Sequence, residues 1–281
     1  GMADVATVLF FNHLKFDPKA PLWTDRDRLI LSAGHGSMLL YSLLYLTGYD
    51  DFTLDEIKNF RQLGAKTAGH PENFLSDAIE TTTGPLGQGL ANSVGFAMAE
   101  EIQRANFGKS IVDHHTYVFA GDGCLMEGVS QEAITFAGRQ KLSKLIVFWD
   151  NNNITIDGKI EISDDTNQVD RFKSSGWHVL EIDGHNPVEI NEAIIDAKKN
   201  SKPTMIACET HIALGSSAQD TAKGHGALTD NKLIEETKKV YGWSQEKFYI
   251  PSEVKKQWEQ IGQKGHKEKL SWENRFKSLS S

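Results

Sequence analysis

Two apolar segments decide the fold: Thr116-Tyr117-Val118-Phe119-Ala120-Gly121-Asp122-Gly123 and Leu145-Ile146-Val147-Phe148-Trp149-Asp150-Asn151-Asn152. Each resembles a buried β-strand that ends in polar residues, and the stretch between them, roughly 126–141, has the character of a helix. A β-α-β unit of this kind is right-handed and brings two parallel strands into one sheet. The sequence therefore predicts that both strands end at the same edge of that sheet.

The polar residues at these two strand ends predict a cation site. Neighbouring strands lie ~4.8 Å apart, so the Asp122 carboxylate and the Asn152 amide oxygen would converge. Mg²⁺ and Ca²⁺ prefer hard oxygen ligands, and both ions also hold phosphate oxygens. Gly121 and Gly123 flank the acid and would let the backbone approach a bulky anion. We therefore expect a metal ion with a bound diphosphate at this edge.

The composition is that of an ordinary globular protein with one large domain or two small ones: 281 residues, 39% hydrophobic and 24% charged. A net charge of −8 argues against a nucleic-acid partner. Cys124 and Cys208 lie in apolar segments, which predicts buried thiols and fits a reducing cytoplasm. No apolar run approaches the ~20 residues of a membrane span, and we recognise no signal peptide.

Strand and helix signals alternate on both sides of the central unit. This pattern is typical of an α/β fold with a largely parallel sheet flanked by helices, in which ligands bind beyond the carboxyl ends of the strands. We predict strands at 28–32, 177–182 and 203–210, helices at 38–46, 54–60, 84–107 and 187–199, a turn at 34–37, loops at 61–83 and 213–229, and a helical, charged region from 230 onward.

Three histidines have glycine beside them: His35, His70 and His225. Glycine neighbours on strand-end loops indicate close access to a ligand, so we predict that these three are functional. The helix predicted at 84–107 is also rich in glycine, although each costs ~1 kcal/mol relative to alanine, which indicates that another segment packs close to its backbone. The remaining histidines are expected to be surface or satisfied core residues without a functional role, and His178 and His185 are expected to be structural: His13, His114, His115, His178, His185, His211 and His266.

Five motifs in this order resemble one enzyme family. They are LSAGHGSMLLYSLLYLTGYD (31–50), FRQLGAKTAGHPE (60–72), ETTTGPLGQGLANSVGFAMAE (80–100), GDGCLMEGVSQEA (121–133) and DNNNITIDG (150–158). Together the motifs resemble the diphosphate-binding half of transketolase, a thiamine diphosphate enzyme. The resemblance covers nearly the whole chain. It implies one thiamine diphosphate-binding domain of the PP type over 1–281, with a helical extension at about 230–281.

The resemblance implies a set of site residues. Mg²⁺ or Ca²⁺ would bind the side chains of Asp122 and Asn152 and the backbone carbonyl of Ile154. His35 and His70 would face the reacting centre as catalytic residues. The coenzyme would contact His35, Gly84, Leu86, Gly123, Asn152 and His225.

The resemblance further implies that the chain is a fragment, or one subunit of a split enzyme, with a fragment favoured. Family members have a second thiamine-binding (Pyr) domain and a C-terminal domain. The glutamate that activates the coenzyme comes from that second domain, across a homodimer interface. On this interpretation the isolated chain is inactive. The loop at 213–227 departs from the family's usual GFGSP-type sequence.

The implied activity is the transfer of a two-carbon glycolaldehyde unit between sugar phosphates in the pentose phosphate pathway. Xylulose 5-phosphate would be the donor and ribose 5-phosphate an acceptor. Two alternatives remain open. One is dihydroxyacetone synthase or another thiamine diphosphate enzyme, and the other is a truncated module without catalysis.

Overall fold

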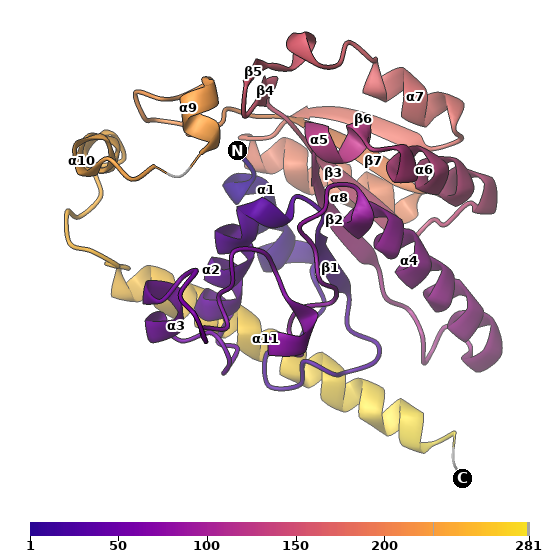
Figure 1. Cartoon of the computed structure of the whole chain (residues 1–281). Coiled ribbons are helices and arrows are strands. Elements are labelled where there is room, and N and C mark those ends of the chain that lie inside the picture. The colour runs from indigo at the N-terminus through magenta and orange to yellow at the C-terminus, as the bar shows by residue number, and fades with distance from the viewer. Residues whose placement is uncertain (227, 280–281) are drawn as a thin grey trace.

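A five-stranded parallel sheet forms the centre of the computed structural model, which describes residues 1–226 and 228–279 (Figure 1). The spatial order of its strands is β1-β2-β3-β7-β6, and all four pairings are parallel. The predicted α/β fold with a parallel sheet flanked by helices is thus confirmed. The strands are β1 (Arg28–Leu31), β2 (Thr116–Gly121), β3 (Leu145–Asn151), β6 (His178–Asp183) and β7 (Thr204–Glu209).

Helices cover both faces of the sheet, which explains the continuous apolar runs of β2 and β3. Tyr117 and Phe119 pack into a core with helices α1, α2, α8 and α11, whereas Val118 and Ala120 pack into a second core with α4, α5, α6 and α7. The helices are α1 (Ala3–Val8), α2 (Ser37–Thr47), α3 (Leu54–Lys58), α4 (Gln88–Phe107), α5 (Asp122–Met126), α6 (Gly128–Gln140), α7 (Gln168–Ser174), α8 (Pro187–Lys199), α9 (Ala222–His225), α10 (Asn231–Val240) and α11 (Ser252–Lys277).

Shorter elements complete the chain. A π-helical turn, Leu9–His13, continues α1, and 3-10 turns lie at Gly34–Gly36, Asn73–Leu75 and Ile160–Ile162. The hairpin of β4 (Ile154–Thr155) and β5 (Gly158–Lys159) follows β3. In the part of the chain that the structure describes, no helix is long and apolar enough to span a bilayer.

Two predicted helices differ from the structure. The helix predicted at 84–107 begins only at Gln88, because Gly84 (φ +146°) and Gly87 (φ +80°) adopt backbone conformations that a helix excludes. The helix predicted at 126–141 is broken at Glu127, whose ψ of 138° separates α5 from α6. A Cβ at Gly87 would lie 2.8 Å from the Glu127 Cβ, so the two irregular segments pack directly on each other.

The glycines of α4 were expected to mark close packing of another segment on the helix, and the structure shows such packing at Gly89 but not at Gly95. A Cβ at Gly89 would lie 2.6 Å from the Ser32 Cα, so the helix touches the chain just after β1. A Cβ at Gly95 would have no neighbouring atom within 4 Å, and this glycine is exposed. Close approach therefore explains Gly89, and the packing does not require Gly95.

Candidate functional site

A cavity of about 580 Å³ lies at the carboxyl edge of the sheet. Its walls come from the segments after β1, β2 and β3, from the β4–β5 hairpin and from α9. The volume is within the range of small-molecule sites. Seven of the predicted site residues line it: His35, Leu86, Asp122, Gly123, Asn152, Ile154 and His225.

The predicted metal ligands Asp122 and Asn152 follow adjacent strands. Asp122 directly follows β2, and Asn152 directly follows β3. Because Gly121 pairs with Asp150 in the β2–β3 register, these two strand ends lie side by side. The Asp122 Oδ1 accepts a hydrogen bond of 2.8 Å from the Trp149 indole N–H. The Asn152 Oδ1 accepts one of 2.9 Å from the Ile154 backbone N–H. These bonds hold both side chains at the strand ends.

The charges around Asp122 suit a cation. The pKa of its carboxyl is raised to about 6, mainly by burial and also by Asp150 and Asp164, whereas the Trp149 hydrogen bond lowers it. Within the described residues, no lysine or arginine lines this cavity. A divalent cation would supply the positive charge that these acids lack, and it would also be needed before a diphosphate could bind here.

The donor set also fits a cation shared with a phosphate. In the described part of the chain, no cluster of three or more histidine, cysteine or acidic side chains could hold a metal by itself, so a metal at Asp122 would need other kinds of ligand. Mg²⁺ is usually bound by one or two carboxylates together with water and ligand phosphates. Asp122, the Asn152 amide and the Ile154 carbonyl are a set of this size, since all three residues line the cavity.

Two of the three predicted histidines form a stacked pair in the cavity. The His35 and His225 rings lie 5.3 Å apart between centroids, at 27°. Burial lowers the pKa of His35, as do His225 and His70, whereas Asp150 raises it. Burial likewise lowers the pKa of His225. The pair is thus neutral near pH 7, and the buried Nδ1 of His225 has no hydrogen-bond partner among the described residues, which leaves it for a ligand.

His70 and Gly84, two of the predicted site residues, do not line this cavity. A Cβ at Gly84 would be 3.2 Å from the His70 Cγ, and a Cβ at Gly34 would be 2.7 Å from the Gly84 backbone nitrogen. Gly34 and Gly84 therefore let the segment that carries His35 pack directly against the loop before α4, and Gly84 also lets that loop pack against His70. These contacts place His70 near the His35 segment, and His70 also lowers the pKa of His35.

Two residues of this site were not singled out in the sequence. Trp149 bonds to Asp122, and the buried indole N–H that requires a partner could have signalled it. Asp150 accepts a hydrogen bond from the Thr210 hydroxyl and raises the pKa of both His35 and His225. Asp150 is an acid near the carboxyl end of β3, and that position in a parallel sheet could have signalled it.

The fold and the cavity define a parallel α/β ligand-binding domain whose site lies beyond the strand carboxyl ends. Residues 1–281 match the model of one family, described as transketolase, thiamine diphosphate binding domain. The chain belongs to this family, as the sequence motifs predicted.

Curated relatives agree with this assignment. The transketolase of Rhodobacter capsulatus is 58% identical over 280 residues, which cover 99% of this chain and 42% of the relative. Transketolase 2 of Vibrio vulnificus is 50% identical over 283 residues, covering 98% of this chain and 42% of the relative. The chain thus spans about 42% of the length of these relatives.

Solved structures show the same fold. Transketolase from Campylobacter jejuni superposes with a TM-score of 0.96 at 43% identity, over 99% of this chain and 44% of the other. A transketolase from Pichia stipitis in complex with sedoheptulose-7-phosphate gives a TM-score of 0.96 at 43% identity, over 99% and 42% of the two chains.

Proposed function

We propose that this chain is the coenzyme-binding part of a transketolase. The enzyme would transfer a two-carbon glycolaldehyde unit from a ketose phosphate such as xylulose 5-phosphate to an aldose phosphate such as ribose 5-phosphate, in the pentose phosphate pathway. The observation that carries this proposal is the convergence of Asp122, Asn152 and the His35–His225 pair on one cavity. Further support comes from Pichia stipitis transketolases, which were solved with sedoheptulose-7-phosphate and xylulose-5-phosphate.

In this proposal Asp122, Asn152 and the Ile154 carbonyl bind Mg²⁺ or Ca²⁺, which neutralises the diphosphate. The Trp149 hydrogen bond orients the Asp122 carboxylate. Leu86 narrows the cavity beside Gly123, because a Cβ at position 123 would lie 2.9 Å from the Leu86 Cδ1. Only glycine at 123 leaves space for a ligand to lie along this wall.

The thiamine diphosphate coenzyme supplies the carbon nucleophile and the electron sink for breaking and forming carbon–carbon bonds. The histidines of the chain would act on the oxygen atoms of the sugar. His35 is neutral near pH 7 and lines the cavity, so it can donate a hydrogen bond and hold a proton at its ring nitrogen as charge develops on a substrate oxygen. His70, its neighbour, would bind a further hydroxyl. The free Nδ1 of His225 would contact the coenzyme or the sugar.

The proposal also includes the expected domain organisation, oligomeric state and cellular compartment. We infer one domain over 1–281 with a helical extension at about 230–281, and a whole protein that acts as a homodimer in the cytoplasm. The buried thiols of Cys124 and Cys208 are consistent with a reducing compartment. The activating glutamate would come from a second thiamine-binding domain, so residues 1–281 alone would be inactive.

An assay of the full-length protein tests the activity. With xylulose 5-phosphate as donor, ribose 5-phosphate should be a good acceptor and formaldehyde a poor one. Preference for formaldehyde would favour dihydroxyacetone synthase, and no transfer to either acceptor would contradict the enzyme proposal. Residues 1–281 assayed alone should bind coenzyme with Mg²⁺ and show no transfer.

A further inference from the structure

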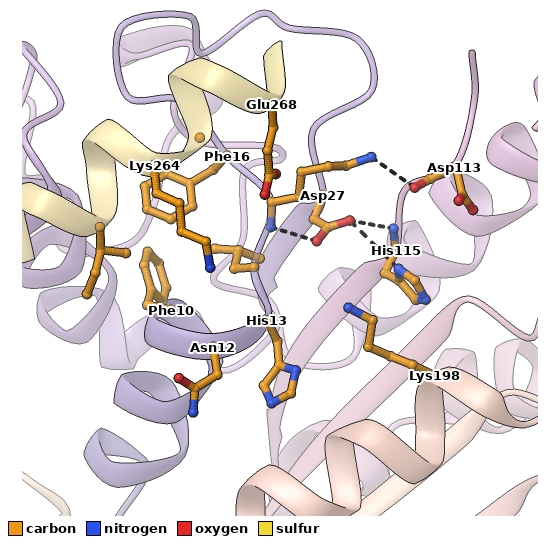
Figure 2. A pocket seen from close by; sticks show the side chains of 14 residues that line it. Phe10, Asn12, His13, Phe16, Asp27, Asp113, His115, Lys198, Lys264 and Glu268 are labelled. Atoms are coloured by element: carbon orange, nitrogen blue, oxygen red, sulfur yellow. Dashed lines mark hydrogen bonds and ion pairs between the residues drawn. The ribbon is translucent and has the colours of Figure 1, made fainter. Parts of the chain in front are cut away.

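A second polar cavity, of about 420 Å³, lies at the opposite, amino edge of the sheet (Figure 2). Asp27 and His115 come from the starts of β1 and β2, and His13 from the end of the π-helical turn. Lys198 reaches in from the last turn of α8, and Lys264 from α11. Figure 2 shows both ammonium groups directed toward the space between the two helices. None of these residues takes part in the coenzyme site proposed above.

The packing of α11 holds Lys264 in place. The neighbouring Gly265 lies so close to the preceding loop that a Cβ there would be 1.4 Å from the Phe16 carbonyl oxygen. One turn earlier, a Cβ at Gly262 would be 2.2 Å from the Thr47 carbonyl oxygen. The backbone of α11 thus packs directly on the backbone at Phe16 and Thr47, and the helix cannot slide along its axis without a steric clash. Lys264 is directed to the cavity by this contact.

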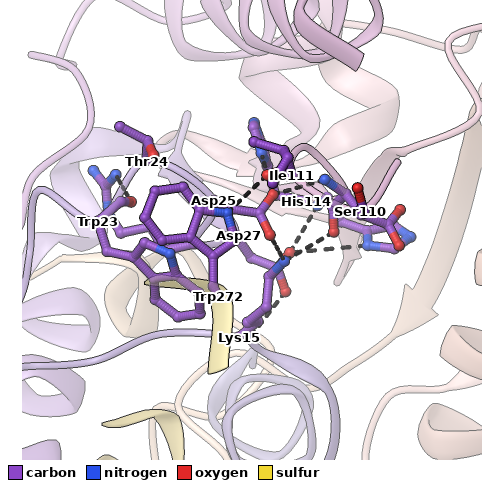
Figure 3. A network of polar contacts seen from close by, with 12 residues as sticks. Lys15, Trp23, Thr24, Asp25, Asp27, Ser110, Ile111, His114 and Trp272 are labelled. Atoms are coloured by element: carbon purple, nitrogen blue, oxygen red, sulfur yellow. Dashed lines mark hydrogen bonds and ion pairs between the residues drawn. The ribbon is translucent and has the colours of Figure 1, made fainter. Parts of the chain in front are cut away.

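Most of the acidic groups around the cavity already have partners (Figure 3). Lys15 forms an ion pair with Asp25, at 2.7 Å. Asp113 pairs with Lys144. Both oxygens of Asp27 accept backbone N–H groups, from Lys15 at 2.8 Å and from His115 at 2.7 Å.

This leaves two lysines and one acid without a partner of their own. Within residues 1–226 and 228–279, the side chains of Lys198 and Lys264 have no hydrogen bond or ion pair. Glu268, which also lines the cavity, is the acid left over. In the described structure, Lys198 and Lys264 are thus the two cations of the cavity that no acid neutralises by direct contact, and Glu268 and the buried Asp27 carboxylate are the negative groups that line the cavity with them.

The two histidines add neutral polar groups to the same walls. Burial lowers the pKa of His13, and Lys198 and Lys264 lower it further, while its Nε2 contacts the Asn191 amide oxygen at 2.9 Å. Burial, followed by Lys198, lowers the pKa of His115 to about 3. Near pH 7 the imidazoles are therefore uncharged, and the lysines carry the positive charge.

From this arrangement we propose that the cavity binds a small phosphate-bearing molecule, whose phosphate pairs with Lys198 and Lys264 while His115 contacts it through a ring nitrogen. A phosphate monoester carries close to two negative charges near pH 7 and matches two ammonium groups. The cavity of about 420 Å³ is larger than one phosphate group needs and leaves room for a small organic group. Under this proposal His115 has a binding role in addition to the surface or core position expected from the sequence.

Calorimetric titration of the chain with inorganic phosphate, at constant ionic strength against chloride, tests the proposal. Phosphate should bind, and Lys198→Met and Lys264→Met should each weaken it by about tenfold, because each removes one charged hydrogen bond. Lys199→Met is the matched control, since Lys199 is the next residue of α8 and does not line the cavity. Glu268→Gln should strengthen phosphate binding about threefold by removing repulsion.

Three results would overturn the proposal. One is the absence of phosphate binding above the chloride background. Another is equal phosphate affinity in Lys198→Met, Lys264→Met and Lys199→Met, which would place the phosphate elsewhere. The third is weaker phosphate binding in Glu268→Gln, because removing a negative charge beside a bound anion should not lower its affinity. Melting curves in chloride check that each variant is folded. Neither coenzyme nor metal is needed, so the outcome is independent of the proposed function.

Discussion

The Trp149 indole N–H donates a hydrogen bond of 2.8 Å to the Asp122 Oδ1. Trp149 belongs to β3 and is only 8% exposed, whereas Asp122 stands at the end of β2. The carboxylate of one strand is thus oriented by the side chain of the next strand. This bond occupies one oxygen of Asp122 and leaves the other free for a cation.

Trp149→Phe should weaken Mg²⁺-dependent binding of thiamine diphosphate by about tenfold, because it removes a hydrogen bond to a charged group and keeps a large aromatic ring. Calorimetry with and without Mg²⁺ measures the change. Trp177→Phe is the matched control, since that indole donates to the Ile134 carbonyl at 2.8 Å, away from the cavity. Equal coenzyme affinity in both variants would show that Trp149 does not position Asp122.

Asp122→Ala should abolish the Mg²⁺ dependence of coenzyme binding and lower the affinity by about a hundredfold or more, because the charged ligand of the cation is lost. Asp165→Ala, an exposed acid on the neighbouring loop, should have no effect. The two proteins can be compared by titrating coenzyme at fixed Mg²⁺. An Asp122→Ala protein that retains wild-type affinity would refute the metal assignment.

Gly89→Ala and Gly95→Ala form a matched pair on α4. The methyl group at 89 would meet the Ser32 Cα at 2.6 Å, so we expect a loss of about 3 kcal/mol or more of unfolding free energy. The methyl group at 95 meets nothing within 4 Å, so we expect a gain of roughly 0.5–1 kcal/mol from helix propensity. Urea denaturation measures both. Similar effects at the two positions would mean that α4 does not pack on Ser32.

His115 should make stability depend on pH. Burial lowers the pKa of this histidine to about 3 from 6.5, so the unfolded chain takes up its proton first as the pH falls. Its contribution to stability is complete above pH 6.5 and is lost progressively toward pH 3. The loss between pH 6.5 and pH 5 is about 2 kcal/mol.

His115→Asn should remove that part of the pH dependence, which urea denaturation at pH 7.5 and pH 5 in phosphate-free buffer would detect. The difference in unfolding free energy between the two pH values should be smaller in the variant than in the wild type. An identical difference in both proteins would show that His115 titrates normally in the folded state.

The interior of the sheet and one edge of the site were predictable from short stretches of sequence. The apolar runs of β2 and β3 predicted parallel pairing, and that pairing places Asp122 and Asn152 at adjacent strand ends. His35 and His225 were predicted from their glycine neighbours and line the same cavity. By contrast, the start of α4 was predicted four residues too early, at Gly84 instead of Gln88. Helix propensity does not report the conformation that a tertiary contact imposes.

The amino-acid sequence by itself determined the parallel α/β architecture, the family and the order of the polar strand ends, because periodicity and residue type act over a few neighbouring positions. Only the tertiary structure decided which groups meet across long separations. The Trp149–Asp122 hydrogen bond, the close approach of Gly34 and Gly84, and the cavity that Lys198 and Lys264 both line all join segments distant in the chain. Such contacts depend on how helices and strands pack in three dimensions, which no local pattern encodes.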